Sequence, residues 1–304
     1  MPEIVLHNYP NSPFSEKVRK IFALKKVAWR SVEQPVIMPK PKLVPLTGGY
    51  RRIPVMQIGA DIYCDTGIIV RKLEELFPQP TIYPTGSEGI CHMINLWADR
   101  HMFFTSTSVI FEKLAPLVPK EFIEDRTKMM PGRDFSDLPK ASYDARNQLR
   151  AFLDMIDRQL RDGRHFLLGG AFSLADAACY HTVWFMRSEP GSFALAQRNP
   201  NLMSWFERVE SMGVGNSTPM SQDEALALAK DSRPATTPSA EPDDPNQLQV
   251  GDRVEVMADD YGFDPIAGTV VVSSLYEIAI EREDPSLSRL VNHFPKVGFR
   301  IRKL

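Results

Sequence analysis

The residues best suited by type and spacing to take part in chemistry lie in segment 9–19, which reads YPNSPFSEKVR. Ser12 followed by Pro13 predicts the start of a helix, because serine is a favoured N-cap and proline a favoured first helical residue. One interpretation is that Ser12 only caps this helix. The other is that its hydroxyl, beside the free N–H groups of a helix N-terminus, stabilises an anion such as a thiolate. The turn contains no cysteine, so a ligand would have to bring the thiol.

A proline at the start of an expected strand is the second feature. The run Arg52-Ile53-Pro54-Val55 places Pro54 where it cannot belong to a central ladder. A cis Ile53–Pro54 bond would leave the N–H and C=O of Ile53 free for an extended ligand. A trans bond at a sheet edge is the commoner arrangement, so the sequence leaves both open.

Charged and hydroxyl side chains near this strand are the third feature. Asp65 and Thr66 open the next expected helix, either as capping groups or as contacts for the charged end of a ligand. Arg52, Lys40 and Lys42 supply positive charge for a carboxylate, unless they lie on a solvated loop face. These residues are therefore candidate contacts for an extended, charged ligand.

Hydrophobic periodicity divides the chain into an α/β part and a helical part. Strands are expected at 3–9, 28–33, 53–58 and 61–64, with helices at 12–25 and 65–77. The order β-α-β-β-β-α describes a small α/β domain over residues 1–84. From residue 88 to about 229 every periodic segment is helical and no strand is expected, so residues 85–231 form an all-helical domain.

A composition change marks the C-terminal part. Residues 232–246, SRPATTPSAEPDDPN, contain four prolines and no large apolar side chain. We expect an exposed, extended linker there, with an ordered loop across the main body as the alternative. Strands expected at 251–257, 267–274, 276–282 and 297–304 then form a small SH3-like β module over residues 247–304.

Composition excludes several functional classes. The 304 residues are 43% hydrophobic and carry a formal net charge of −2, which gives no electrostatic basis for binding nucleic acid or an anionic membrane. No apolar run reaches the roughly 18 residues of a membrane helix, and the first residues are unlike a secretory signal. Three widely spaced cysteines and six histidines show no disulfide or metal-ligand pattern. We expect a cytoplasmic protein without a metal.

Taken together, these motifs resemble the cytosolic glutathione transferases over about residues 4–215. The resemblance rests on SPF followed by KVR, on RIPV, on the DT pair and on FSLAD at 172–176, where Ser173 and Asp176 predict a capping box. It implies a thioredoxin-like N-terminal domain, a helical C-terminal domain whose core helix starts at that box, a homodimer, and glutathione as co-substrate.

The resemblance also assigns roles to residues. Ser12 matches the serine that donates to the glutathione sulfur, and the absence of cysteine there argues against thiol-exchange chemistry. Asp65 and Thr66 match the contacts of the γ-glutamyl end, although the family usually has Glu or Gln followed by Ser. Ile53 matches the main-chain partner of the cysteinyl part, and Arg52 matches a lysine that binds the glycyl carboxylate. The implied glutathione-binding residues are thus Arg52, Ile53, Pro54, Asp65 and Thr66.

The second substrate is expected between the first helix and a long helix around residues 88–114. Candidate contacts for this substrate are Tyr9, Phe14, His101 and Phe104, although aromatic residues at helical spacing more often belong to the hydrophobic core. The first hypothesis is an enzyme of the general conjugating type, which activates the glutathione thiol for attack on a small hydrophobic electrophile. The alternative is a catalytically weak binding or scaffold protein whose β module mediates interactions.

Overall fold

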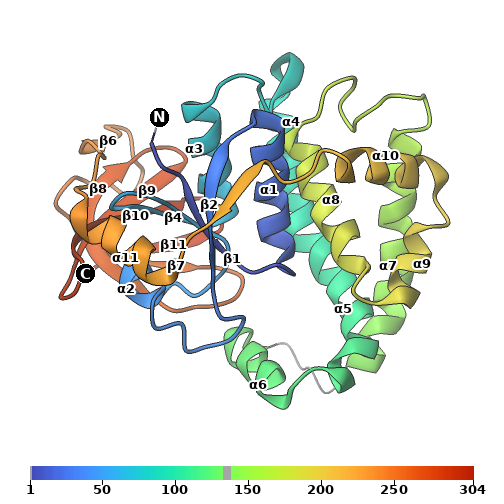
Figure 1. The fold of residues 1–304 in the computed structure, drawn as a ribbon, viewed down its shortest axis with the longest axis horizontal. Helices are drawn as coiled ribbons and strands as arrows, with labels where there is room; N and C mark the ends of the chain where they lie inside the picture. The colour runs from blue at the N-terminus through green and yellow to red at the C-terminus, as the bar shows by residue number, and fades with distance from the viewer. Residues whose placement is uncertain (1, 133–137) are drawn as a thin grey trace.

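The computed structural model describes residues 2–132 and 138–304 (Figure 1). Its strands are β1 (Val5–Asn8), β2 (Ala28–Glu33), β3 (Val55–Ile58), β4 (Asp61–Cys64), β5 (Asn216–Pro219), β6 (Ser239–Ala240), β7 (Arg253–Ala258), β8 (Ile266–Ser273), β9 (Glu277–Asp284), β10 (Ser288–Pro295) and β11 (Phe299–Lys303). Its helices are α1 (Pro13–Lys25), α2 (Val44–Thr47), α3 (Thr66–Leu76), α4 (Glu88–Trp97), α5 (Phe103–Leu114), α6 (Lys120–Met129), α7 (Leu138–Gln159), α8 (Leu174–Met186), α9 (Pro190–Ala196), α10 (Pro200–Glu210) and α11 (Gln222–Asp231).

The N-terminal α/β domain has the predicted order of elements, with the short helix α2 added between β2 and β3. Strand β1 pairs in parallel with β2 and antiparallel with β3, and β3 forms a hairpin with β4. Helix α1 buries Val18, Ile21 and Phe22 along one face. Helix α3 buries Ile69 and Leu73 in the same core. The thioredoxin-like fold of this domain is confirmed.

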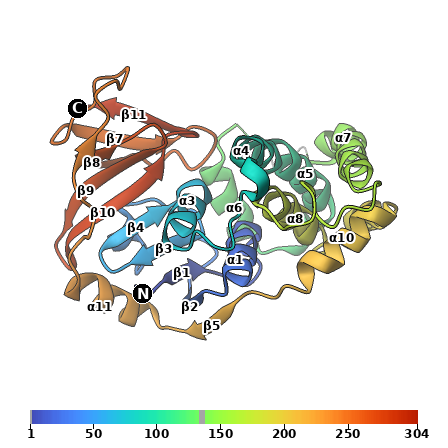
Figure 2. The same ribbon diagram turned by 90° about the horizontal axis from the view of Figure 1, so that it is seen from above.

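The helical domain packs on the α1 side of the sheet (Figures 1 and 2). Helices α4 and α5 form one long helix, joined by the π-helical segment Ala98–Met102. Helix α8 starts at the predicted capping box, in which the Asp176 carboxylate accepts from the Ser173 backbone N–H at 2.9 Å and the Ser173 hydroxyl at 2.6 Å. In the described part of the chain, no helix combines the length and the apolar character needed to span a bilayer.

The prediction that residues 88–229 contain no strand is wrong at one place. After α10 the chain returns to the N-terminal domain, where β5 pairs in parallel with β2 (Figure 2). All four residues of β5, NSTP, are exposed, so the strand has no hydrophobic alternation for sequence reasoning to detect. Its position comes from backbone pairing with the edge of β2.

The C-terminal strands form a β module that continues the N-terminal sheet. The strand order of the whole sheet is β11-β7-β8-β9-β10-β4-β3-β1-β2-β5, with β6 paired to β8. The junction is β10, which pairs in parallel with β4, and this strand is missing from the predicted set. Its residues are polar at Asn292 and His293 and end at Pro295, although all three are buried. Asn and Pro are depleted in strands, so their presence keeps this segment from being predicted as a strand.

Module and N-terminal domain also share a hydrophobic core. Leu46, Ile62 and Cys64 of the N-terminal domain belong to the same buried cluster as Ile280 and Phe294 of the module. Between the domains, residues 232–246 run extended over the surface and are largely exposed. The backbone N–H of Ala235 and the hydroxyl of Thr236 both donate to Asp61, at 2.7 and 2.6 Å. This segment is therefore anchored on the sheet.

Candidate active site

Ser12 lies at the junction of β1 and α1, where its backbone leaves the extended conformation and the helix begins. Its hydroxyl oxygen accepts from the Ser15 backbone N–H at 3.2 Å, and Pro13 is the first helical residue. The side chain is almost fully buried, yet it lines a large cavity between the two domains. Because the oxygen acts as acceptor in the cap, the hydroxyl can still donate its proton to an anion in the cavity.

The turn before β3 and the turn before α3 face each other in a smaller compartment, named the polar compartment for its charged lining residues, which include Arg52, Asp65 and Asp99. The Ile53–Pro54 peptide bond is cis. Asp65 caps α3 by accepting from the Gly67 backbone N–H at 2.7 Å, and its φ of 93° is rare for a residue with a side chain. Such backbone conformations concentrate at ligand sites. Burial raises the pKa of Asp65, and the nearby Arg52 opposes this shift.

The two compartments adjoin each other and share lining residues. The polar compartment has a volume of about 280 Å³ and is lined by Ile53, Pro54, Asp65 and Thr66, all predicted site residues. The cavity beside Ser12 has a volume of about 840 Å³. Residues that line both are Phe14, Arg52, Ile53 and Tyr261. A ligand could therefore bind at α3 with one end and reach Ser12 with the other, passing Ile53.

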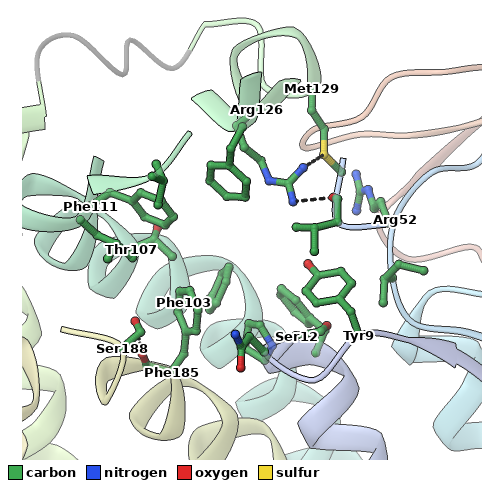
Figure 3. Close-up of a pocket in the computed structure, with 18 of the residues that line it drawn as sticks. Tyr9, Ser12, Arg52, Phe103, Thr107, Phe111, Arg126, Met129, Phe185 and Ser188 are labelled. Atoms are coloured by element: carbon green, nitrogen blue, oxygen red, sulfur yellow. Dashed lines mark hydrogen bonds between the residues drawn. The ribbon is translucent and has the colours of Figure 1, made fainter. Parts of the chain in front are cut away.

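The larger cavity is mostly apolar (Figure 3). Of the predicted contacts, Tyr9, Phe14 and Phe104 line it, whereas His101 is exposed and belongs to the lining of neither compartment. Burial raises the pKa of Tyr9, and the Arg126 cation opposes the shift. Sequence reasoning missed most of the wall, whose further apolar members include Phe111, Phe122, Met129, Trp184 and Phe185.

Positive charge gathers at one end of this cavity. Arg51 and Arg126 both form ion pairs with Asp125 of α6, the latter at 2.6 Å. The Lys40 ammonium donates to the backbone carbonyl of Arg51 at 3.0 Å. Burial, reinforced by the cations of Arg126 and Arg51, lowers the pKa of Lys40 to about 7. The other predicted lysine, Lys42, lies outside the cavity lining.

A buried ion pair fixes α1 against the helical domain. The Lys17 ammonium, fully buried, lies 2.5 Å from an Asp99 carboxylate oxygen in the π-helical segment. The other oxygen of Asp99 contacts Nε2 of His181 at 2.9 Å. Burial alone would raise the pKa of Asp99, but Lys17 and His181 outweigh it and lower the pKa. This network holds the floor of the polar compartment, which Asp99 also lines.

The C-terminal module supplies a wall that sequence reasoning did not anticipate. This wall is the loop between β7 and β8, whose Asp260 and Tyr261 reach Arg52. No sequence signal indicates this contact, since the pairing residues are 208 positions apart. Among the described residues, no group of three or more His, Cys, Asp or Glu side chains is placed to hold a metal ion.

The fold combines a thioredoxin-like N-terminal domain, an all-helical domain and a C-terminal β module, with two adjoining compartments near the N-terminus of α1. A family model described as glutathione S-transferase, N-terminal domain, matches residues 6–81. A second, described as glutathione S-transferase, C-terminal domain, matches residues 122–208. A probable glutathione S-transferase of Solanum tuberosum is 21% identical over 209 residues, which cover 67% of this chain and 85% of that protein.

Solved structures agree with these matches. The crystal structure of a GST-like protein from Pseudomonas syringae has a TM-score of 0.84 and 35% sequence identity, covering 100% of both chains. The Tau class glutathione S-transferase of mango, Mangifera indica, shares the fold with a TM-score of 0.53 and 16% identity over 75% of this chain and 96% of its own. The chain belongs to the glutathione S-transferase family.

Proposed function

We propose that this protein is a glutathione transferase of the general conjugating type, in which Ser12 stabilises the glutathione thiolate. The observation that carries the proposal is the position of Ser12, at a helix N-terminus on the wall of an apolar cavity that adjoins a polar compartment. The sulfur forms a bond to an electrophilic carbon of the second substrate, and the leaving group departs with the electrons of its bond to that carbon. The Ser12 hydroxyl donates to the thiolate, and the dipole of α1 favours its negative charge.

The proposed placement of glutathione follows the two compartments. The γ-glutamyl end lies at Asp65 and Thr66, where an ammonium group meets the half-buried carboxylate of Asp65. The cysteinyl part pairs with the main chain of Ile53, next to Pro54, at the boundary between the compartments. This position directs the thiol toward Ser12. The polar compartment is thus assigned to the tripeptide and the large cavity to the electrophile.

The second substrate is proposed to be a small hydrophobic electrophile. The aromatic walls near Phe14 and Phe104 favour apolar groups. At the opposite end, Arg51 and Arg126 provide two cations against the carboxylate of Asp125, and Lys40, whose pKa is lowered to about 7, adds a partly protonated amine. This excess of positive charge is complementary to a negative or strongly polar group on that substrate.

Location and assembly are part of the same proposal. The cysteines Cys64, Cys91 and Cys179 are free and buried, which suits a reducing compartment such as the cytoplasm. We propose a homodimer, which sedimentation of the purified protein would test.

The proposal is tested by Ser12→Ala, with Ser221→Ala as matched control. Both serines are N-caps, Ser12 of α1 and Ser221 of α11, so each variant loses a cap of about 0.5–2 kcal/mol. Only Ser12 lines the cavity. We expect Ser12→Ala to lower kcat about 100-fold or more for a general electrophile, with KM for glutathione within a few-fold. Ser221→Ala keeps the wild-type rate.

A direct measurement of the thiol completes this test. Ultraviolet absorbance of the bound thiolate, followed against pH, should give a lower thiol pKa in the wild type than in Ser12→Ala. Equal turnover in wild type and Ser12→Ala would contradict the role of Ser12. Absence of binding at millimolar glutathione would contradict the proposal and favour a binding protein.

A further inference from the structure

Three basic side chains, Lys40, Arg51 and Arg126, form a cation cluster at one end of the large cavity. All three belong to the cavity lining, whereas Asp125, which pairs with two of them, does not and is buried. One Asp125 oxygen accepts from the Arg51 guanidinium and from the Met38 backbone N–H at 3.1 Å. The other accepts from Nη1 of Arg126 at 2.6 Å. This carboxylate therefore holds the two guanidinium groups from behind the wall, and the cavity lining keeps an excess of positive charge.

The other charged residues of the described lining do not cancel this excess. Glu33 is the one acid among them, and it is exposed, so water and salt screen its charge. Arg52 and Arg187 also line the cavity, but they already pair with Asp260 and Glu210. The unbalanced positive charge of the lining therefore belongs to the cation cluster.

Tyr9 connects the cation cluster to the proposed position of the thiol. Its side chain lies between Ser12 and Arg126 (Figure 3), and the Lys40 ammonium lies 6.0 Å from its ring centroid. Arg126 and a hydrogen bond with Ser12 both oppose the rise in the pKa of Tyr9 that burial causes. One aromatic side chain therefore separates the cation cluster from the residue that is proposed to hold the thiolate.

The aromatic wall of the cavity extends up to the cation cluster. The Arg126 guanidinium lies over the ring of Phe122, 4.6 Å from its centroid. The Phe122 ring stacks on Phe111, with centroids 6.0 Å apart and an interplanar angle of 8°. Both rings line the cavity. An aromatic substrate can therefore pack against these rings while a charged group on it reaches Arg126.

We propose that the electrophile is an aromatic carboxylate, whose carboxylate group binds Arg51 and Arg126 and whose reacting carbon faces Ser12. This inference rests on the proposed function and names the class of its second substrate. A carboxylate matches the planar guanidinium groups, because their N–H donors form charge-assisted hydrogen bonds with its oxygens. A bound anion also favours the protonated form of Lys40, whose pKa is about 7 without it.

The inference is tested with two electrophiles that differ in charge, 4-chloro-3-nitrobenzoate and 4-chloro-3-nitrobenzamide. In both, the glutathione sulfur forms a bond to the ring carbon that carries chlorine, and chloride leaves with the electrons of its bond. Dividing each kcat/KM by the rate constant without enzyme corrects for the different reactivity of the two rings. We expect the corrected kcat/KM of the wild type to be about 10-fold or more higher for the benzoate, because hydrogen bonds to charged groups contribute that much.

Variants of α6 assign this preference to the cation cluster. Arg126→Gln should lower the preference for the benzoate about 10-fold and should raise KM for the benzoate rather than KM for glutathione. Arg126→Lys keeps the positive charge and should keep part of the preference. Lys128→Gln removes a cation from an exposed position of the same helix and should match the wild type.

The outcomes separate this inference from the proposed function. Equal corrected values for the two electrophiles, or an unchanged preference in Arg126→Gln, overturn the carboxylate specificity and leave the proposed function standing. A rise in KM for glutathione in Arg126→Gln, without a rise for the benzoate, also overturns it, because the cation cluster then binds the tripeptide. Turnover of a general electrophile without turnover of the benzoate has the same meaning.

Absence of turnover with every electrophile overturns the proposed function, and this inference with it. The comparison of the two electrophiles on the wild type needs no variant, so it stands even if Arg126→Gln folds poorly.

Discussion

His293 provides a sharp test of how the module is joined to the rest of the chain. It lies on β10, fully buried beside β4, with Nε2 3.2 Å from Asp61 and Nδ1 2.5 Å from Glu277. Its ring stacks on Tyr63 with centroids 4.3 Å apart. Burial alone would lower the pKa of His293, but the hydrogen bonds to Asp61 and Glu277 outweigh it and raise the pKa. The interface between the module and the N-terminal domain therefore contains a histidine whose charged form is favoured by its two carboxylate partners.

The magnitude of its contribution follows from these contacts. Removing one partner of a buried charge pair costs about 3–5 kcal/mol. Asp61 keeps two other donors, the Ala235 N–H and the Thr236 hydroxyl, and Glu277 is 27% exposed and can be hydrated. We therefore expect His293→Gln to lower the free energy of unfolding by the smaller figure, about 3 kcal/mol.

The pH dependence has a definite sign. Because the folded-state pKa of His293 is raised, its contribution is complete below the unfolded pKa of about 6.5 and is lost as pH rises through the folded pKa. Urea unfolding of the wild type below and above neutrality should show this loss, and His293→Gln should not. His165→Gln, an exposed control, should stay within about 0.5 kcal/mol of the wild type. If His293→Gln had the same stability and the same pH dependence as the wild type, the reasoning would be refuted.

Two further predictions concern the domain contacts. Asp99→Asn leaves the fully buried Lys17 ammonium without its carboxylate and should lower the free energy of unfolding by about 3–5 kcal/mol, whereas Lys17→Met combined with Asp99→Leu should recover most of it. Additive losses in urea unfolding of the double variant would count against this coupling. Truncation after Ser232 exposes the edge of β4 and the shared core around Ile62, so the shortened chain should aggregate in light scattering. A monomeric, folded truncated chain would show that the β10–β4 pairing is dispensable.

Local signals in the sequence were sufficient for the N-terminal domain. Ser12 and Pro13 mark the start of α1 because capping depends on adjacent residues, and Asp65 marks the start of α3 in the same way. The capping box of Ser173 and Asp176 is likewise local. Each of these features depends on residues within one helical turn, so spacing alone reveals it.

The pairing of strands that are distant in the sequence was not predicted from the sequence. Strand β5 is exposed along its length and β10 contains Asn292 and Pro295, so neither shows the alternation that marks a strand. Their partners, β2 and β4, are far away in the sequence. Backbone hydrogen bonds do not depend on side-chain identity, so the residue types do not reveal this pairing. The occupation of Arg52 by Asp260 is of the same kind.

The sequence by itself determined the family and the helix starts, and it predicted several residues that line the two compartments, because these depend on short-range patterns. Only the tertiary structure decided that the C-terminal strands extend the N-terminal sheet and that Tyr261 stands at the boundary between the two compartments. The physical reason is that edge pairing and ion pairing depend on where surfaces meet in space, which the order of residues along one segment does not specify.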